Sequence, residues 1–228
     1  MGLVEQRKDE VWELESIILF TSECETIYKY YNLIRKCHFP QKYSNSIPYH
    51  YHLLKTKEVG QHFSQFYPEM DDREFYIACL GHDVLEDTAC KEQDLIEWGF
   101  PAFSIELIKA VTDEPGKNRK ERKLKTYPKI RGNKLATALK LCDRIANVRA
   151  NLEEGNDGLI NMYRNEHQEF INNLQVEGEL DVMWMYLGNL LYQGQVLNFP
   201  KKTPRGRVMY DMGRGTMEQD FDCPCCEE

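Results

Sequence analysis

The stretch Gly81-His82-Asp83-Val84-Leu85-Glu86-Asp87-Thr88 gathers an imidazole and three carboxylates within six residues, directly after an apolar run. On a helix, residues four positions apart share a face, so that His82 would lie beside Glu86 and Asp83 beside Asp87. Carboxylates this close repel one another at neutral pH, and a bound cation would remove the repulsion. The stretch therefore favours a metal site; the alternative is an exposed acidic helix end that happens to carry a histidine.

Helical periodicity continues on both sides of this stretch. Ser22 with Glu25 matches a capping box, and Asp71 with Glu74 predicts the start of a helix that runs toward Asp87. Apolar residues recur at helical spacing in six further segments, which are His52–Phe66, Glu92–Trp98, Phe103–Val111, Lys134–Glu154, Leu159–Leu174 and Leu180–Gln193. No segment alternates convincingly with a period of two, so we expect an all-α fold.

A second candidate for chemistry lies in the predicted helix 134–154. Asp143 adjoins the apolar stripe of this helix, which is formed by Leu135, Leu139, Cys142 and Ile145. A partly buried carboxylate needs a partner, and Asn147 shares its face one turn later. The alternative is a salt bridge from Asp143 to Arg144 or Arg149.

Histidines form the third candidate group. The segment Pro48-Tyr49-His50-Tyr51-His52 carries two of them, and His38 and His62 lie nearby in the sequence. Most single histidines are core or surface residues rather than metal ligands. Spacing by itself does not choose among these four.

Composition sets outer limits on function. The chain has 228 residues, of which 42% are hydrophobic and 29% charged, as in an ordinary soluble domain. Its net charge of −8 argues against a nucleic-acid partner. No apolar run approaches the ~18 residues of a membrane span, and the charged segment Met1 to Glu15 lacks the apolar region of a secretory signal. We therefore expect a cytoplasmic protein.

One basic segment departs from the acidic average. Residues 117–134 contain nine lysines and arginines against the single acid Glu121. Such a run is usually a solvated loop or helix face, and the alternative is a clamp for a polyanionic small molecule.

The cysteines and the C-terminal residues complete the organisation. Five cysteines are scattered singly, as buried reduced thiols would be, namely Cys24, Cys37, Cys79, Cys90 and Cys142. Only Cys223, Cys225 and Cys226 cluster, and a zinc site would need a second pair nearby. We expect an N-terminal helical extension over residues 1–20, one domain over 21–198, and an irregular tail with Gly, Pro and Cys over 199–228.

Taken together, these segments resemble the hydrolase domain of the RelA/SpoT family, the (p)ppGpp 3′-pyrophosphohydrolases, including their small standalone forms. The resemblance runs in order from about Ile27 to Leu174 and implies a helical bundle of the HD type. It rests on Cys37-His38, Gln41, Pro48-Tyr49, His52, His82-Asp83, Glu86-Asp87-Thr88, Val111-Thr112, Lys140-Leu141-Cys142-Asp143-Arg144, Asn147 and Arg149.

The resemblance also implies a site. One Mn²⁺-like ion would be held by His52, His82, Asp83 and Asp143, a ligand set that suits Mn²⁺, Fe²⁺ or Co²⁺, with Mg²⁺ also possible. The ion would polarise phosphorus and lower the pKa of the attacking water. The implied roles of the remaining residues are water activation for Glu86 and Asp87, a contact to the sugar or phosphate for Asn147, and a grip on distal phosphates for Arg119, Arg122 and Lys123.

Three positions depart from the family pattern. Tyr43 stands where the family has an arginine that packs on the guanine base, and its ring could still stack a base. Ser46 replaces a glycine, and Ala150 replaces a threonine. The chemistry implied by the resemblance is intact, whereas guanine preference is not implied.

Three functions are compatible with these residues. The first is a (p)ppGpp-type 3′-pyrophosphohydrolase that releases pyrophosphate from a small-molecule nucleotide. The second is an HD phosphomonoesterase that acts on (deoxy)nucleoside 5′-monophosphates or on NADPH, to which Tyr43 and Ala150 point. The third is a nucleotide-binding domain without catalysis, against which the retained Glu86 and Asp87 argue.

Overall fold

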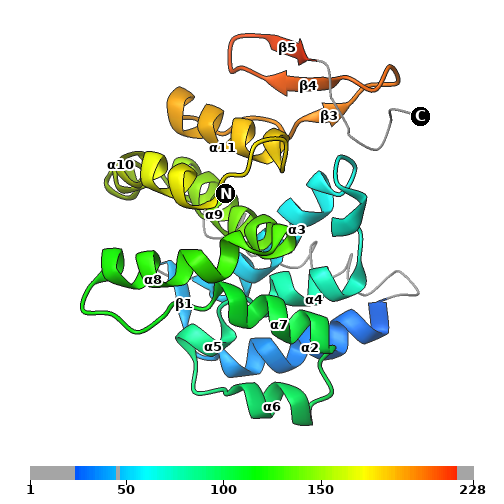
Figure 1. The fold of residues 1–228 in the computed structure, drawn as a ribbon, viewed down its shortest axis with the longest axis vertical. Coiled ribbons are helices and arrows are strands. Elements are labelled where there is room, and N and C mark those ends of the chain that lie inside the picture. Colours follow the sequence, from blue (N-terminus) through cyan, green and yellow to red (C-terminus); the bar gives the residue numbers. More distant parts are fainter. Residues whose placement is uncertain (1–23, 45–46, 220–228) are drawn as a thin grey trace.

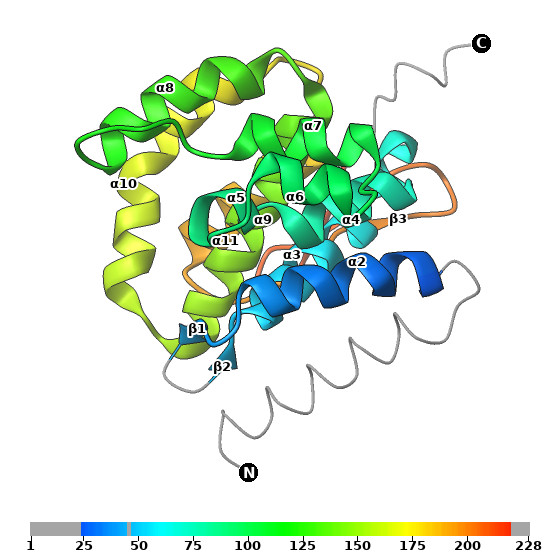
Figure 2. The same cartoon turned by 90° about the horizontal axis from the view of Figure 1, so that it is seen from below.

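The computed structural model describes residues 24–44 and 47–219 and confirms the expected helical bundle (Figures 1 and 2). Its helices are α2 (Cys24–Cys37), α3 (His50–Phe63), α4 (Arg73–Gly81), α5 (Val84–Asp87), α6 (Glu92–Glu97), α7 (Ala102–Val111), α8 (Arg119–Arg131), α9 (Lys134–Glu154), α10 (Asp157–Leu174) and α11 (Asp181–Gln193), with a short 3-10 helix at Pro68–Met70. The expected N-terminal extension, the Ser22 cap and the clustered tail cysteines lie outside the described residues.

Helix α9 is the centre of the bundle. It packs against α3, α4, α7, α8, α10 and α11. Its bounds follow from local chemistry, since the Asn133 side chain accepts hydrogen bonds from the backbone N–H groups of Leu135 and Ala136, and Gly155 ends the helix at a φ of 66°. Of the predicted stripe, Leu139, Cys142 and Ile145 are fully buried. A helix enclosed in this way holds Asp143 at a fixed position inside the protein.

The predicted helix toward Asp87 is broken, which corrects the expectation from sequence. Helix α4 is capped by Asp72 rather than Asp71 and ends at Gly81, and α5 begins only at Val84. On a continuous helix, adjacent side chains point about 100° apart. The turn between the two helices instead brings His82 Nε2 within 2.9 Å of Asp83 Oδ2.

The absence of a side chain at Gly81 permits close packing at this turn. A Cβ atom there would lie 2.8 Å from Cδ1 of Ile108 in α7. Helix α4 therefore approaches α7 more closely at its last residue than a larger side chain would allow. This contact anchors the turn that carries His82 and Asp83.

The C-terminal segment forms a small sheet, whereas an irregular tail was expected. Strands β3 (Lys201–Lys202), β4 (Val208–Asp211) and β5 (Thr216–Gln219) pair antiparallel and lie at the α11 end of the bundle (Figure 1). Val208 and Tyr210 face inward, while Met209 between them is exposed. Strands of two to four residues are too short to show this alternation clearly in the sequence.

A two-stranded hairpin, β1 (Lys42–Ser44) with β2 (Ile47–Pro48), leads into α3. Within the described part of the chain, none of the helices combines the length and the hydropathy that a membrane span requires.

Candidate active site

Four side chains from three separate segments meet inside the bundle. His52 comes from α3, His82 and Asp83 from the α4–α5 turn, and Asp143 from α9. His52 Nε2 lies 3.1 Å from His82 Nε2 and 3.3 Å from Asp143 Oδ1. The four residues expected to be metal ligands are therefore brought together, and donor atoms of three of them, His52, His82 and Asp83, lie within 4.8 Å of one another.

The protonation of His82 bears on whether this cluster fits a metal ion. Its Nδ1 lies 2.8 Å from the backbone oxygen of Cys79, which can only accept, so Nδ1 carries the proton. Its Nε2 faces His52 Nε2 and the Asp83 carboxylate, which acts against burial to raise the pKa of His82, so that Nε2 holds a second proton or a metal ion. A histidine whose other ring nitrogen is held by a backbone carbonyl is the usual arrangement of a metal ligand.

Opposite charges within the cluster stabilise one another and offset the cost of burial. Burial disfavours the charged forms, but the cationic form of His82 holds the pKa of Asp83 well below its usual range. Burial would also raise the pKa of Asp143, but the Lys140 ammonium holds that pKa well below its usual range. Hydrogen bonds to the two carboxylates overcome burial and raise the pKa of His52. The two carboxylates therefore stay ionised and available as ligands.

A second set of side chains braces the two carboxylates. Tyr49 Oη donates to Asp83 Oδ2 at 2.6 Å, and Asn147 Nδ2 donates to Asp143 Oδ1 at 2.6 Å. Lys140 Nζ lies 2.9 Å from Asp143 Oδ2. The predicted pairing of Asp143 with Asn147 is confirmed, whereas Lys140 was missed, although its position three residues before Asp143 on a helix indicates a shared face.

The two arginines considered as alternative partners of Asp143 bond elsewhere. Arg144 Nη1 lies 3.2 Å from Glu166 Oε2 in α10, and Arg149 Nη1 donates to the backbone oxygen of Leu197 at 2.7 Å. Both partners lie far along the chain, and for that reason the sequence did not indicate them.

Tyr43 lies against the cluster itself. Its ring stacks on that of His52, with centroids 5.1 Å apart and an interplanar angle of 1°. Its hydroxyl donates to Asn147 Oδ1 at 3.0 Å. One face of the ring is thus occupied by a candidate ligand, and Tyr43 is not among the residues that line the cavity beside the cluster.

Glu86 and Asp87 project from α5 beside the cluster, and both are exposed. Glu86 Oε2 accepts from the backbone N–H of Asp113 at 3.3 Å, and Asp87 Oδ2 accepts from Gln41 Nε2 at 3.2 Å. The surrounding protein still desolvates Glu86 enough to raise its pKa above the ordinary value. A carboxylate with a raised pKa next to a metal-type cluster suits proton transfer.

A cavity of about 160 Å³ opens onto the cluster and reaches the basic helix α8. Four acids and four bases lie in its walls, so that their charges cancel, and a divalent cation would leave an excess of two positive charges. The lining residues are Tyr49, His52, Asp83, Glu86, Asp87, Arg119, Lys123, Lys140, Asp143, Arg144, Asn147 and Tyr163. The sequence indicated no role for Tyr163, which α10 contributes.

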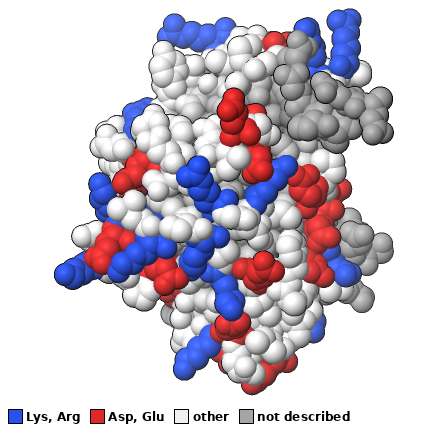
Figure 3. Space-filling view, in the orientation of Figure 1, with Lys and Arg blue, Asp and Glu red and all other residues white. Residues whose placement is uncertain are grey.

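The basic segment divides into two parts. Arg119 and Lys123 line the cavity, and Lys123 Nζ also lies 3.1 Å from Asp113. Arg122, also expected to bind phosphate, is not among the lining residues. Other cations of α8 pair with acids on the surface, for example Lys125 with Glu121. Figure 3 shows basic and acidic side chains interspersed on this part of the molecule. Most of the segment is therefore a solvated helix face, and two of its residues face the cavity.

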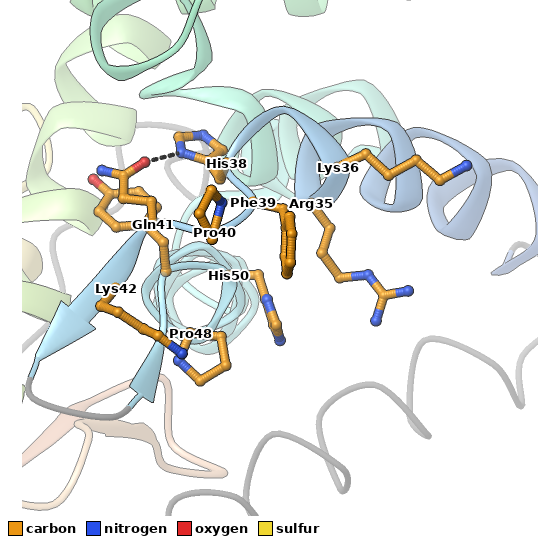
Figure 4. Close-up of a pocket in the computed structure, with 10 residues that line it drawn as sticks. Arg35, Lys36, His38, Phe39, Pro40, Gln41, Lys42, Pro48 and His50 are labelled. Carbon is orange, nitrogen blue, oxygen red and sulfur yellow. Dashed lines mark hydrogen bonds between the residues drawn. The ribbon is translucent and has the colours of Figure 1, made fainter.

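A larger cavity of about 360 Å³ lies behind the wall formed by His38, Gln41 and Tyr49. Figure 4 shows the 2.8 Å hydrogen bond between His38 Nδ1 and Gln41 Oε1 at its edge. Among the described residues, none of its lining side chains is a carboxylate. The smaller cavity, which contains the ligand cluster, is therefore the candidate active site.

The arrangement of the helices matches an HD-like helical bundle. A solved structure with a similar fold is that of a metazoan ortholog of SpoT, described as hydrolysing ppGpp and playing a role in starvation responses. The two chains are 18% identical with a TM-score of 0.55, and the similarity covers 77% of this chain and 98% of the other. At this identity the likeness establishes the fold. No protein-family model and no curated protein matches the sequence.

Replacing Lys140 with Met is expected to destabilise the protein by about 3 kcal/mol at pH 7, because the buried Asp143 carboxylate loses its cation. The pKa of Asp143 is lowered in the folded protein. Its ion pair therefore contributes stability above the unfolded-state pKa, and this contribution is lost as the pH falls through the folded pKa. The difference between parent and variant, measured by urea denaturation, should shrink below about pH 4.

Lys109→Met is the matched control. Lys109 Nζ pairs with Glu92 at 2.7 Å, but the two side chains are 50% and 45% exposed. Loss of this exposed ion pair should lower the free energy of unfolding by less than about 0.5 kcal/mol. Equal destabilisation by the two variants at pH 7 would contradict the role given to Lys140.

Proposed function

We propose that this protein is a metal-dependent phosphohydrolase of nucleotides. The observation that carries the proposal is the meeting of His52, His82, Asp83 and Asp143 in one cluster, at a cavity that four basic side chains also line. The similarity of the fold to a ppGpp-hydrolysing protein supports the same class of reaction. A borderline divalent ion, Mn²⁺ before Co²⁺, Fe²⁺ or Mg²⁺, suits two imidazoles and two carboxylates.

The protein's own residues would divide the reaction between them. When bound, the ion supplies Lewis-acid polarisation of a phosphoryl oxygen. Glu86 takes the proton of the attacking water, since its raised pKa brings it closer to neutral pH. Asp87 orients that water while Gln41 holds its carboxylate at 3.2 Å. Tyr49 and Asn147 keep the two ligand carboxylates in position through their 2.6 Å hydrogen bonds.

The basic wall of the cavity favours a substrate with more than one phosphate. Arg119 and Lys123 reach the cavity from α8, and Lys140 and Arg144 reach it from α9. Arg119 is held by Glu166, with Nε to Oε1 at 2.7 Å, so its guanidinium is positioned in advance. This supports a (p)ppGpp-type 3′-pyrophosphohydrolase that releases pyrophosphate, whereas Asn147, expected to contact the sugar or phosphate, bonds to Asp143 and Tyr43 instead.

Tyr43 favours the alternative reaction, phosphomonoester hydrolysis of a (deoxy)nucleoside 5′-monophosphate or of NADPH. Because its ring stacks on His52, the side chain that would replace the family's guanine-packing arginine is turned toward the ligands. A purely nucleotide-binding domain is the third outcome of the test.

The deciding experiment is Mn²⁺-supplemented turnover of ppGpp, deoxynucleoside monophosphates and NADPH in parallel, with separate assays of pyrophosphate and orthophosphate. Pyrophosphate from ppGpp is the expected product. Asp83→Ala should lose both bound Mn²⁺ and turnover because it removes a ligand, whereas Asp157→Ala, at an exposed position, should retain both.

Each other outcome has a distinct meaning. Orthophosphate from a monophosphate or from NADPH would replace the leading reaction with the alternative one. Nucleotide binding without release of either product would indicate the binding domain. Full turnover and full Mn²⁺ content in Asp83→Ala would refute the metal site.

Glu86→Gln tests the assignment of the proton acceptor. The variant should bind Mn²⁺ as the parent does, while kcat falls by about 10²-fold or more through loss of acid–base assistance. Metal content by elemental analysis and kcat by product release separate the two effects. Glu106→Gln, an exposed position on α7, is the control, and an unchanged kcat in Glu86→Gln would assign Glu86 a structural role.

Tyr43→Leu and Tyr43→Phe separate support of the ligand from contact with the base. Loss of the ring that stacks on His52 should weaken Mn²⁺ binding about 10-fold in Tyr43→Leu, as expected for a residue behind a metal ligand. Tyr43→Phe keeps the ring and should bind Mn²⁺ nearly as the parent does. A raised KM with unchanged Mn²⁺ affinity in Tyr43→Leu would instead place Tyr43 against the substrate base.

A further inference from the structure

Two cysteines that are distant in sequence lie in contact beside the candidate active site. Cys37 is the last residue of α2, and Cys90 lies in the loop between α5 and α6, 53 positions later. Their Sγ atoms are 2.6 Å apart, compared with about 2.05 Å in a disulfide. Both side chains are only partly buried. The expectation of separate, buried thiols is therefore wrong for this pair.

We propose that Cys37 and Cys90 form a reversible disulfide, with a low-molecular-weight disulfide such as oxidised glutathione as the oxidant. The sulfur atoms already lie in contact, so that bond formation needs no large movement of either segment. This modification site stands independently of the proposed phosphohydrolase activity, since it rests on the thiol pair alone.

The exchange proceeds in two steps. Burial, together with the neighbouring Cys90, raises the pKa of Cys37 to about 12, which assigns the first attack to Cys90. The Cys90 thiolate attacks the S–S bond of oxidised glutathione, forms a mixed disulfide and releases one glutathione thiolate. Cys37 then loses its proton and attacks the Cys90 sulfur, which releases the second thiolate. Both protons end on glutathione, so that one oxidised glutathione becomes two reduced ones.

A second cysteine pair provides an internal comparison. Cys79 and Cys142 also interact through their side chains, but both are fully buried in the core between α4 and α9. An oxidant the size of glutathione cannot reach them in the folded protein. Partial exposure, rather than proximity alone, distinguishes Cys37 and Cys90 as a modifiable pair.

The disulfide would close a ring around a contact of the candidate site. Gln41, four residues after Cys37, donates to Asp87, three residues before Cys90, at 3.2 Å. The backbone N–H of Cys90 is also held by Thr88 Oγ1 at 3.0 Å. Oxidation would thus link the end of α2 covalently to the segment that carries Asp87 and stabilise this edge of the cavity.

The test uses the full chain incubated with oxidised glutathione, then alkylated, digested and mapped by mass spectrometry without reduction. The expected result is one cross-linked peptide pair that joins Cys37 to Cys90, together with a Tm about 5–10 °C higher, reversed by dithiothreitol. Cys90→Ser should lose both the cross-link and the shift. Cys79→Ser, the matched control, should retain both.

Three results would overturn the proposal. The first is complete alkylation of Cys37 and Cys90 after treatment with the oxidant. The second is Cys90 joined to a different cysteine or left as a stable mixed disulfide with glutathione. The third is a rise in Tm that persists in Cys90→Ser, which would place the stabilising bond elsewhere in the chain.

Discussion

Two imidazole nitrogens 3.1 Å apart, facing two ionised carboxylates inside a helical bundle, are the constraint on which the rest of the structure depends. Such a cluster is costly to bury unless every lone pair and charge has a partner. The surrounding side chains meet this requirement for the carboxylates, since Tyr49, Asn147 and Lys140 each bond to one of them, whereas the buried Nδ1 of His52 has no hydrogen-bond partner among the described residues. The two carboxylates are thereby fixed in position next to the imidazole nitrogens, where the proposed cation would bind.

The cavity joins two opposite electrostatic environments. Its acidic end is built on α3, the α4–α5 turn and α9, and its basic end on α8 and α9. Glu166 of α10 bonds both Arg119 and Arg144, so that these guanidiniums are fixed at the cavity rather than free in solvent. An anion between the two ends would contact the cluster on one side and fixed cations on the other, which is the arrangement that phosphoryl chemistry uses.

Features that depend on neighbours along one helix could be predicted from the sequence. Helix α9 has the predicted bounds, and Asp143 meets Asn147 one turn later because a helix places such pairs on one face. The break after Gly81 and the stacking of Tyr43 on His52 could not be predicted, since both depend on contacts with distant segments. The C-terminal strands were missed because they are too short to show a period.

By itself, the sequence determined the helical class of the fold and the chemical types available at the site, because periodicity and residue identity are local properties. The spacing of the histidines left open which of them meet, and the family resemblance implied His52; the tertiary structure brings His52 rather than His50 to Asp143 through the packing of α3 on α9. It also decided that Lys123 lines the cavity and Arg122 does not, although both lie beside Asp113. The physical reason is that long-range packing selects among side chains whose local chemistry is equivalent.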